Sequence, residues 1–505
     1  MRMNITEARQ RIEKLRELIN RYRYHRLVLD TPIEDEAVED KLKKELFDLE
    51  QQYPSLVTLD SPTQRVAGAS LAAFEKFKHP ERMLSFNDVF NSQDLGEWAE
   101  RMQRIDPNAL TDGFYCELKI DGLAIELIYE DGLLTTGATR GDGFIGENVT
   151  QNLKTIEAIP LRLHTAKQTI ETLNKVGRKD LAKHINKQGI PKILVVRGEV
   201  FLTHKEFERV NREQIKANKP VYANPRNLAA GSIRQLDPAI TASRRLDSYC
   251  YSLRTALGQT THEQEHVLLQ ALGFKTNPHN EFCKTLDNIQ SFRDRWEKGR
   301  TKLGYEIDGT VVLVNNNVMF EKLGVVGKAP RGGMAYKFAP KEAPTRLNDI
   351  IVSVGRTGVL TPVAVLAPVD IGGTTVSRAT LHNEDEIKRL GVKIGDTVVV
   401  GRAGDVIPDV KRVLVELRTG KEKIFHFPKT CPVCSGPVVR IEGEAAYKCT
   451  NAGCPAVKRE ALYHFVAKGA FDIERIGPRV IDQLITAGLI TDAADLFTIT
   501  KEDLL

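Results

Sequence analysis

The sequence predicts a multidomain α+β protein, for three reasons. Its 505 residues exceed what one hydrophobic core uses, since domains hold about 100–200 residues. Its composition, 41% hydrophobic and 28% charged, is typical of a globular chain, and no apolar run reaches the ~18–20 residues that span a bilayer. Helix-like and strand-like patterns also succeed one another in blocks. We therefore expect several packed modules and no membrane insertion.

The blocks define five expected modules. ITEARQRIEKLRELINRY has helical spacing, whereas YCELKIDGLAIELIYE and ILVVRGEVFL are β-rich runs among helices. Later runs such as DIIVSVGRTGVLTPVAVLAPV predict short strands with Gly turns, as in a small barrel. The expected modules are a helical unit at 1–70, an α+β domain at 71–344, a barrel at 345–425, a cysteine-rich finger at 426–457 and helices at 458–505.

Four of the seven cysteines have the spacing of a zinc finger. Cys431, Cys434, Cys449 and Cys454 form the pattern C-x2-C-x14-C-x4-C, and two Cys pairs on turns can bind one tetrahedral Zn2+. Four ligands close the coordination shell, so the metal is expected to be structural. The alternative is four unrelated cytosolic thiols. Cys116, Cys250 and Cys283 stand singly and are expected to be buried thiols.

The two ends of the chain carry further signals. MRMNITEARQ lacks the apolar segment of a secretory signal, so we expect a reducing cytoplasm and no disulfides. Near the other end, Ile-Gly-Pro lies between two helical patterns, which predicts a helix-hairpin-helix for DNA phosphates or an ordinary turn in a small bundle. The chain ends in TITKEDLL, a helix start without a partner, and we expect an incomplete C-terminal module.

Basic residues are concentrated in one stretch. Residues 162–192 hold eight Lys/Arg and two Asp/Glu, a local charge of 8 − 2 = +6 against +5 for the whole chain. The stretch is expected to be a solvated surface helix, with DNA phosphates as the less favoured alternative partner.

A charged strand face marks the expected reactive site. In YCELKIDG the period-2 alternation puts Glu117, Lys119 and Asp121 on one face, and the residues between them on an apolar face. A solvated edge strand would show the same pattern. However, TRGDGFIGENVT, VVRGEVF, NPRNLAAGSIRQLD, YEIDGTVV and APRGGMAYKF also set charged residues beside strands or Gly turns. Together these segments predict a phosphate-binding site.

With these motifs in this order, the chain resembles bacterial NAD-dependent DNA ligases over nearly its whole length. The resemblance implies a nucleotidyltransferase (ATP-grasp-like) adenylation domain, an OB-fold, a four-Cys zinc finger and a partial helix-hairpin-helix. The resemblance stops before the family's terminal BRCT domain, which we do not expect within these 505 residues. The implied activity is NAD-dependent sealing of 5′-phosphate/3′-hydroxyl nicks through a lysyl-AMP and a DNA-adenylate, in replication and repair. The implied cofactors are NAD+, Mg2+ (or Mn2+) and structural Zn2+, and the implied partner is nicked duplex DNA bound by a monomer.

The resemblance also assigns roles to individual residues. Lys119 is the expected nucleophile, and a free lysine, with a pKa of about 10.4, needs nearby positive charge or desolvation to react at pH 7. Lys337 and Mg2+ are expected to supply that charge, with Asp121 as a further catalytic residue. The expected nucleotide ligands are Ser85, Glu117, Arg140, Glu199, Tyr251, Arg300 and Asp308, with Glu117 and Tyr251 at the adenine. Arg226 and Arg234 are expected at phosphates and DNA.

Two single residues and one N-terminal motif depart from the family pattern. Leu313 replaces a lysine that acts with the phosphate-site cations, and Gly332 replaces a usual Trp. Aligned without gaps, the N-terminal Tyr-His pair becomes Arg26 and Leu27, and Asp-x-x-Tyr-Asp becomes Glu36-x-x-Glu39-Asp40. Tyr24 and His25 lie two positions earlier, a rotation of about 200° on a helix.

These departures leave three functional hypotheses. The first is an active NAD-dependent ligase, the second is a ligase-derived nick-binding protein impaired in self-adenylation, and the third is a ligase with another adenylyl donor. If Leu313 lies in an open phosphate cleft, Leu313→Lys should accelerate lysyl-AMP formation. If it packs in a compensated pocket, the same change should destabilise the domain.

Overall fold

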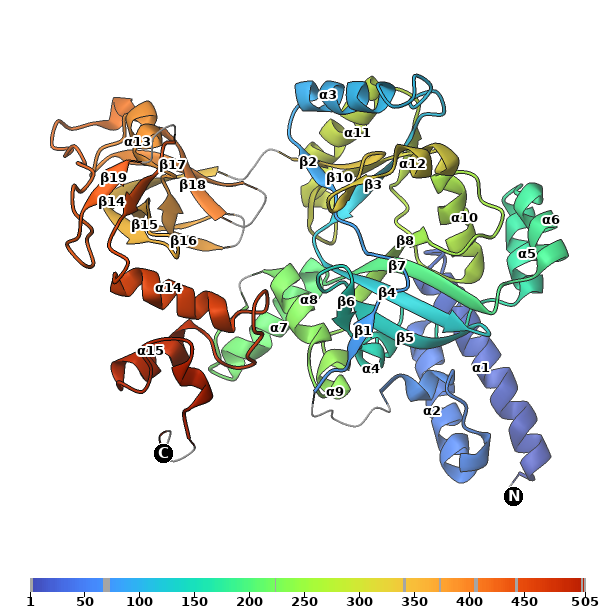
Figure 1. Cartoon of the computed structure of the whole chain (residues 1–505). Helices are drawn as coiled ribbons and strands as arrows, with labels where there is room; N and C mark the ends of the chain where they lie inside the picture. Colours follow the sequence, from blue (N-terminus) through green and yellow to red (C-terminus); the bar gives the residue numbers. More distant parts are fainter. Residues whose placement is uncertain are drawn as a thin grey trace. The chain divides into compact units, whose positions relative to one another are not determined.

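The computed structural model describes residues 3–66, 73–222, 224–338, 342–371, 374–403, 407–440, 444–500 and 503. The chain divides into two compact units, Met1–Ala339 and Pro340–Leu505 (Figure 1). The predicted module boundary at residues 70 and 71 lies outside the described residues. Within the described part of the chain, no helix is both long enough and apolar enough to cross a bilayer.

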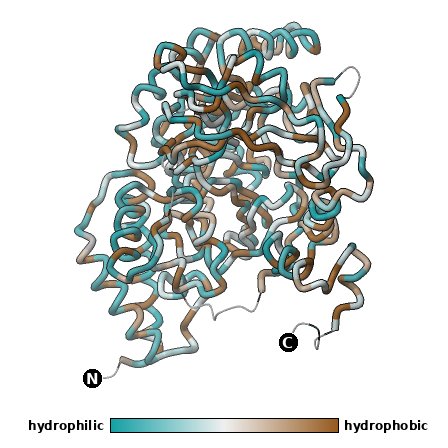
Figure 2. The backbone as a smooth tube through the Cα atoms, turned by 90° about the vertical axis from the view of Figure 1, so that its left-hand side faces the viewer, coloured by the Kyte–Doolittle hydropathy of each residue, from teal (hydrophilic) through white to brown (hydrophobic). Residues whose placement is uncertain are grey.

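The first unit begins with a pair of helices, as predicted. Helix α1 (Ile5–Leu27) starts at Asn4, whose side chain accepts a hydrogen bond from the Glu7 amide while Glu7 caps Asn4 in return. Apolar residues at helical spacing on α1 pack against α2 (Glu36–Gln52). Most residues of the helices beside the N-terminus are hydrophilic in Figure 2, whereas hydrophobic residues gather in the interior strands. The core of the helical unit includes Ile12, Leu15 and Ile19 of α1 with Leu46 and Leu49 of α2.

Two antiparallel-rich sheets form the central α+β domain. The first has the order β2 (Asn87–Val89), β13 (Gly333–Lys337), β10 (Ile307–Val314), β3 (Phe114–Ile120), β9 (Glu281–Cys283). The second has the order β5 (Leu133–Thr139), β4 (Leu123–Glu130), β7 (Ile193–Phe201), β8 (Asp247–Leu253). Two short strands, β1 (Lys76–Lys78) and β6 (Ile145–Glu147), pair separately, as do β11 (Val325–Val326) and β12 (Ala329–Pro330).

The chain passes from the first sheet to the second at Asp121 and Gly122, between β3 and β4. This crossing requires glycine, because a Cβ on Gly122 would lie 2.3 Å from the Val200 carbonyl oxygen and 2.8 Å from Glu199 Cγ. The end of β3 is thereby held close to β7 of the other sheet. Lys119, the predicted nucleophile, lies two residues before the crossing.

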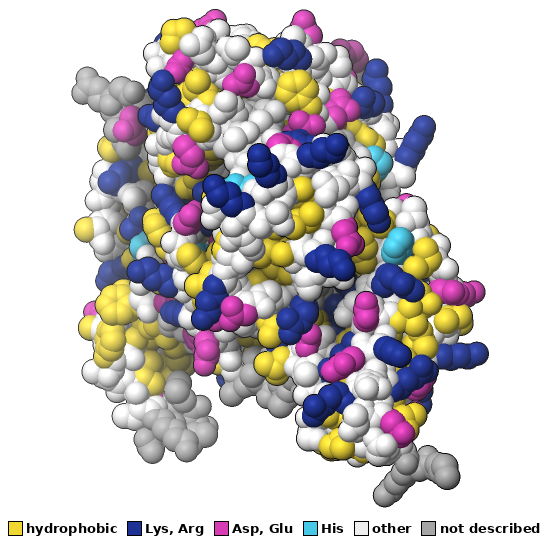
Figure 3. Space-filling model, turned by 90° about the vertical axis from the view of Figure 1, so that its right-hand side faces the viewer, with side chains coloured by type: hydrophobic (Ala, Val, Ile, Leu, Met, Phe, Trp, Pro, Cys, Tyr) yellow, Lys and Arg dark blue, Asp and Glu magenta, His cyan; other side chains and the backbone are white. Residues whose placement is uncertain are grey.

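Helices cover the sheets and connect their strands. They are α3 (Ser92–Gln103), α4 (Thr150–Lys154), α5 (Ala166–Lys175), α6 (Lys179–Gln188), α7 (His204–Lys216), α8 (Pro225–Ile233), α9 (Pro238–Ala242), α10 (His262–Leu272), α11 (Leu286–Gly299) and α12 (Asn317–Leu323). The basic stretch forms α5 and α6, which bury Leu173, Leu181 and Ile185 and leave their lysines exposed. On the face that Figure 3 shows, Lys and Arg side chains are spread with Asp and Glu between them.

The second unit contains a closed five-stranded barrel. β14 (Glu342–Val354) pairs with β15 (Val359–Asp370) and β17 (Thr397–Ala403), while β16 (Thr375–Thr380) and β18 (Ile407–Val413) complete the ring. Buried and partly exposed residues alternate along β15 from Val359 to Leu366, as a barrel wall requires. Helix α13 (Glu384–Leu390) packs on this core through Ile387.

The cysteine-rich segment forms a hairpin beside the barrel. Its strands β19 (Val438–Arg440) and β20 (Tyr447–Cys449) pair with each other, and β20 also pairs with β15. Two helices follow, α14 (Pro455–Val466) and α15 (Pro478–Thr486), which pack through Leu462, Val466, Ile481 and Leu484. The Ile-Gly-Pro turn lies immediately before α15, with Gly477 as its N-cap. The helix-hairpin-helix assignment stays a prediction.

Candidate active site

A cavity of about 1010 Å3 lies between the two sheets of the central domain. Its walls come from β3, β10 and β13 of one sheet, from β4, β7 and β8 of the other, and from the segment 81–86. The predicted site residues among its lining residues are Ser85, Glu117, Lys119, Arg140, Glu199, Arg226, Arg234, Tyr251 and Lys337. Residues that are far apart in the sequence thus meet around one space.

Lys119 and Lys337 share a carboxylate on the strand between them. Gly309 of β10 lies opposite Lys119 on one side and Lys337 on the other. The preceding Asp308 has its Oδ1 3.2 Å from Lys119 Nζ and its Oδ2 2.6 Å from Lys337 Nζ. Burial works against the charge of Asp308, but the two lysines outweigh it and lower the pKa of this carboxyl. The arrangement holds two ammonium groups at one wall of the cavity.

Glu199 occupies the opposite sheet, at the crossing point of the chain. Burial raises its pKa to about 7, although Lys119, Arg226 and Arg140 act in the other direction. The Arg226 guanidinium is bound to Asp121 at 2.8 Å. A carboxylate of this kind is a hard oxygen ligand, and a divalent cation such as Mg2+ would offset the charge that burial disfavours. The residues present therefore fit a Mg2+ ion at Glu199.

The remaining predicted residues differ in their placement. Arg234 reaches the cavity rim and pairs with Glu147 at 2.9 Å, and the Ser85 hydroxyl donates to the Lys328 carbonyl at 3.3 Å. Arg140 is exposed at the end of β5. Burial raises the pKa of Tyr251 on β8. Arg300 lies outside the lining set, with its guanidinium carbon 5.5 Å from the centre of the Phe338 ring.

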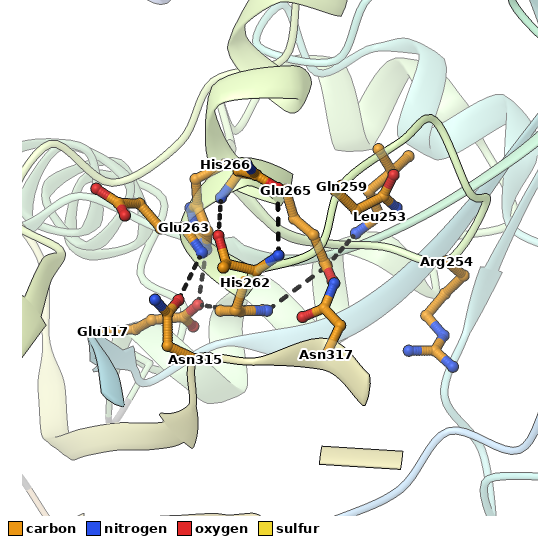
Figure 4. Close-up of polar contacts among 12 residues, drawn as sticks. Glu117, Leu253, Arg254, Gln259, His262, Glu263, Glu265, His266, Asn315 and Asn317 are labelled. Atoms are coloured by element: carbon orange, nitrogen blue, oxygen red, sulfur yellow. Dashed lines mark hydrogen bonds and ion pairs between the residues drawn. The ribbon is translucent and has the colours of Figure 1, made fainter. Parts of the chain in front are cut away.

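Glu117 contacts two histidines that the sequence analysis did not single out. His262 Nε2 and His266 Nε2 each lie 2.7 Å from Glu117 Oε1, and both residues belong to α10 (Figure 4). Burial disfavours ionisation of Glu117, but His266 and His262 together lower its pKa to about 2. Glu117 is therefore an ionised carboxylate at neutral pH.

A second buried cluster supports the segment 81–86. Glu126 accepts hydrogen bonds from His79 at 2.7 Å and from Arg197 at 2.8 Å, and none of these side chains is more than slightly exposed. Arg197 then donates to the Glu81 and Arg82 carbonyls at 2.6 and 3.3 Å. These contacts fix one edge of the cavity. No local sequence pattern predicts these contacts, because the partners lie 47 and 71 residues from Glu126.

Leu313 lies at the Glu117 end of the cavity. It is 7% exposed, pairs with Tyr115 on β3 and lines the cavity, whereas Gly309 pairs with Lys119. Four residues of strand separate positions 309 and 313, about 13 Å. The register therefore gives no support to the expectation that a lysine at 313 would join the cations beside Lys119.

The space beside Gly332 is filled by another side chain. A Cβ on Gly332 would lie 2.9 Å from Phe320 Cδ2 and 3.3 Å from Leu323 Cδ1. Phe320 of α12 also lines the cavity. An aromatic residue of α12 therefore closes the cavity wall beside Gly332.

The altered N-terminal motif makes contacts within the first unit. Arg26 pairs with Glu39 at 3.2 Å and with Glu157 at 2.9 Å, and Lys43 pairs with the same two carboxylates. Tyr24 is buried, and its hydroxyl donates to the Gln270 carbonyl at 3.1 Å. The Glu36 side chain lies outside what the structure describes. In this structure, Arg26 attaches the helical unit to the central domain through Glu157, and Tyr24 does so through Gln270.

The four predicted zinc ligands converge. The Sγ atoms of Cys431 and Cys454 lie 3.9 Å apart, those of Cys434 and Cys449 lie 3.6 Å apart, and all four are within 4.8 Å of one another. Tetrahedral Zn–S bonds of ~2.3 Å place sulfur atoms about 3.75 Å apart, so the set fits Zn2+. The Gly436 amide donates to Cys434 and lowers the pKa of this thiol to about 6.

Comparison with known protein families agrees with this architecture. Residues 5–67 match a DNA ligase-like, N-terminal NAD+-binding domain. Residues 71–178 and 172–341 match the adenylation domain of NAD-dependent DNA ligases, and residues 344–422 match their OB-fold domain. Residues 430–456 match their C4 zinc finger domain. The predicted adenylation, OB-fold and zinc-finger folds are confirmed.

Curated relatives extend the similarity to the whole chain. A DNA ligase of Halalkalibacterium halodurans is 45% identical over 505 residues, which cover 100% of this chain and 71% of the relative. A DNA ligase of Carboxydothermus hydrogenoformans is 44% identical, and the match covers 99% of this chain and 72% of the relative. A DNA ligase of Bacillus subtilis is 45% identical, and the match covers 99% of this chain and 71% of the relative. The matched domains and the similarity over the whole chain point to the same family. The chain therefore belongs to the family of NAD-dependent DNA ligases.

Proposed function

We propose that Lys119 is the residue that carries AMP in this ligase. Its unprotonated Nζ attacks the α-phosphorus of NAD+, a P–N bond forms, and the P–O bond to nicotinamide mononucleotide breaks with its electron pair. The nitrogen loses its proton to solvent. A 5′-phosphate oxygen at a DNA nick then attacks the same phosphorus and displaces Lys119, which regains a proton. Finally the 3′-hydroxyl attacks the 5′-phosphorus, releases AMP and loses its proton, so that the nick is closed.

The position of Lys119 between two sets of charged groups carries this proposal. On one side, Asp308 bridges Lys119 and Lys337, so a second cation is held at the place where phosphate charge would lie. On the other, Glu199 lines the cavity and would hold Mg2+, which supplies charge neutralisation at the phosphates when bound. We propose that Asp121 is a further catalytic residue and that Arg226 contacts phosphates and DNA, at an edge that their ion pair of 2.8 Å helps to order.

The other roles follow from where the side chains line the cavity. We propose that Glu117 and Tyr251 bind adenine, that Ser85 and Arg140 bind the rest of the nucleotide, and that Arg234 contacts phosphates. Arg300 lies over Phe338, next to Lys337, and we propose that it contributes positive charge from outside the cavity wall.

We further propose that the enzyme works as a monomer in the cytoplasm, on nicked duplex DNA. The residues that line the cavity all belong to the unit Met1–Ala339, so the proposed site is complete within one unit, and bacterial DNA lies in the cytoplasm. The modules are proposed to be 1–70, 71–344, 345–425, 426–457 and 458–505, which the family matches at 5–67, 71–341, 344–422 and 430–456 support. Light scattering of the purified protein checks the monomer.

A nick-sealing assay tests the proposal. The wild type should seal nicked duplex with NAD+ and Mg2+ but not with ATP, whereas Lys119→Ala should seal none. Binding of Lys119→Ala to nicked duplex should stay within about threefold of the wild type, because phosphate contacts spread over several modules dominate affinity. Sealing by the variant at the wild-type rate would contradict the role of Lys119. Sealing with ATP alone would contradict NAD+ as the donor.

A further inference from the structure

Two histidines hydrogen-bond to the same carboxylate oxygen of Glu117. His262 and His266 lie one helical turn apart on α10, on the face toward β3, and both Nε2 atoms lie 2.7 Å from Oε1 (Figure 4). An ionised carboxylate only accepts hydrogen bonds, so the imidazole nitrogens are the donors. Both donors are used on Oε1, which leaves Oε2 as the oxygen available to a ligand in the cavity that Glu117 lines.

The two histidines are held in place from several sides. The Tyr115 ring packs against both imidazoles, with ring centroids 5.6 Å from His262 and 4.8 Å from His266. His262 Nδ1 lies 3.5 Å from Glu265 Oε2. Burial disfavours the charge of His262, but Glu265 and Glu117 raise its pKa to about 10. His262 is therefore a cation that bridges two carboxylates at neutral pH.

Helix α10 is itself attached to the end of β10. The His262 amide donates to the Asn315 carbonyl at 2.8 Å, and the Glu263 amide donates to Asn315 Oδ1 at 3.1 Å. Asn317 Nδ2 donates to Glu265 Oε1 at 3.0 Å. Hydrogen bonds thus connect the histidines to Glu117 on β3 and connect their helix to the end of β10.

We propose that His262 and His266 are positioning residues that enable Glu117 to recognise the substituent at C6 of the purine base. They fix the Glu117 carboxylate as a pure acceptor, so its free oxygen accepts from the exocyclic amine of adenine and repels the carbonyl oxygen that hypoxanthine carries at the same place. This inference rests on the proposed adenine role of Glu117. It assigns to the histidine pair the selection of an adenine dinucleotide over its deaminated counterpart.

A bound metal ion is the alternative for the same three side chains, whose ligand atoms lie within 4.8 Å of one another. However, both Nε2–Oε1 distances are 2.7 Å, a hydrogen-bond length. Ligands around a tetrahedral Zn2+ with bonds of ~2.0 Å lie about 3.3 Å apart. The observed distances therefore favour hydrogen bonds.

The test compares NAD+ with nicotinamide hypoxanthine dinucleotide as donors for the AMP or IMP adduct, measured as the ratio of kcat/KM. The wild type should favour NAD+ strongly. His266→Leu and His262→Leu should lower this ratio by about tenfold or more, because Glu117 would lose its orientation and its fixed charge. His266→Gln, which keeps an N–H donor, should restore most of the ratio. A merely structural role would reduce both donors equally.

His279→Ala is the matched control, since His279 packs on Trp296 and not on Glu117. Calorimetric binding of AMP and IMP to the same variants gives the base preference without any chemistry. If the wild type formed no adduct but bound AMP more tightly than IMP, this would contradict Lys119 as the residue that carries AMP and support the recognition of adenine by Glu117. Folded His266→Leu and His262→Leu variants with the wild-type preference would overturn the inference. Stoichiometric Co2+ binding to zinc-loaded wild type that is lost in His266→Leu would also overturn it, in favour of a metal site.

Discussion

Glu199 is a residue whose charge depends strongly on its surroundings. It lies where the chain crosses between the two sheets, and burial raises its pKa to about 7 despite three nearby cations. An unfolded glutamate titrates near 4.3. Between about pH 4.5 and 7, Glu199 therefore keeps a proton in the folded state that it has already lost in the unfolded state. The folded protein loses stability as the pH rises through this window, because Glu199 must then ionise while buried.

We accordingly expect Glu199→Gln to raise the melting temperature of the apo protein at pH 8 by about 2 °C or more, with a smaller gain at pH 5. The amide removes the buried charge at pH 8, whereas at pH 5 the carboxyl of the folded wild type is already protonated. Thermal melts at both pH values, without Mg2+ or NAD+, measure the difference. The same variant should lose most of its Mg2+-dependent adenylation. An equal or larger gain at pH 5 would show that Glu199 is not the titrating group.

At the residue scale, the sequence predicted the charged face of β3 but not the histidines that hydrogen-bond to Glu117 on it. Alternation in YCELKIDG distinguished Cys116 and Leu118, which join a hydrophobic core, from the charged residues Glu117 and Lys119 of the cavity, although Leu118 also reaches the cavity wall. The histidines at Glu117 lie 145 and 149 residues away, and no local pattern links them to β3. The spacing H-E-Q-E-H does place two imidazoles on one helix face, but which strand they meet depends on the tertiary fold.

At the scale of elements, the zinc hairpin is the part that a metal must organise. Strands β19 and β20 are only three residues each, and the cluster of Cys431, Cys449 and Cys454 contributes most of the buried side chains there. Spacing alone predicted this element, because the ligands are close in the chain. The barrel was also predictable, because short β-rich runs with Gly turns mark it in the sequence, whereas the pairing of β20 with β15 was not.

We expect zinc removal to disorder this hairpin and leave self-adenylation intact. Cys434→Ser should lose about one Zn2+ per chain and weaken binding to nicked DNA, because a small finger of this type folds with its metal. The adenylation cavity lies in Met1–Ala339, so AMP-adduct formation should stay within about threefold of the wild type. Zinc analysis, DNA binding and adduct yield are measured together. Val433→Ala, between two ligands and exposed, is the control. Full zinc content in Cys434→Ser would remove Cys434 from the ligand set.

At the scale of the whole molecule, the chemistry and the zinc site belong to different units. The first unit holds the nucleotide cavity together with the N-terminal helices, and the second holds the barrel, the hairpin and helices α14 and α15. Composition and length predicted such a modular chain. They did not predict that Arg26 and Lys43 would clamp the helical unit to Glu157, because residues at 26, 43 and 157 carry no shared sequence pattern.

The most direct test of the account is to map the AMP group on the intact protein. After incubation with NAD+ and Mg2+, digestion and tandem mass spectrometry should find the adduct on Lys119, with Lys337 unmodified and with nicotinamide mononucleotide released in equal amount. Lys337→Ala should slow formation of the same adduct without moving it. An AMP group on any other residue, or its normal appearance in Lys119→Ala, would contradict the assignment of Lys119 as the nucleophile.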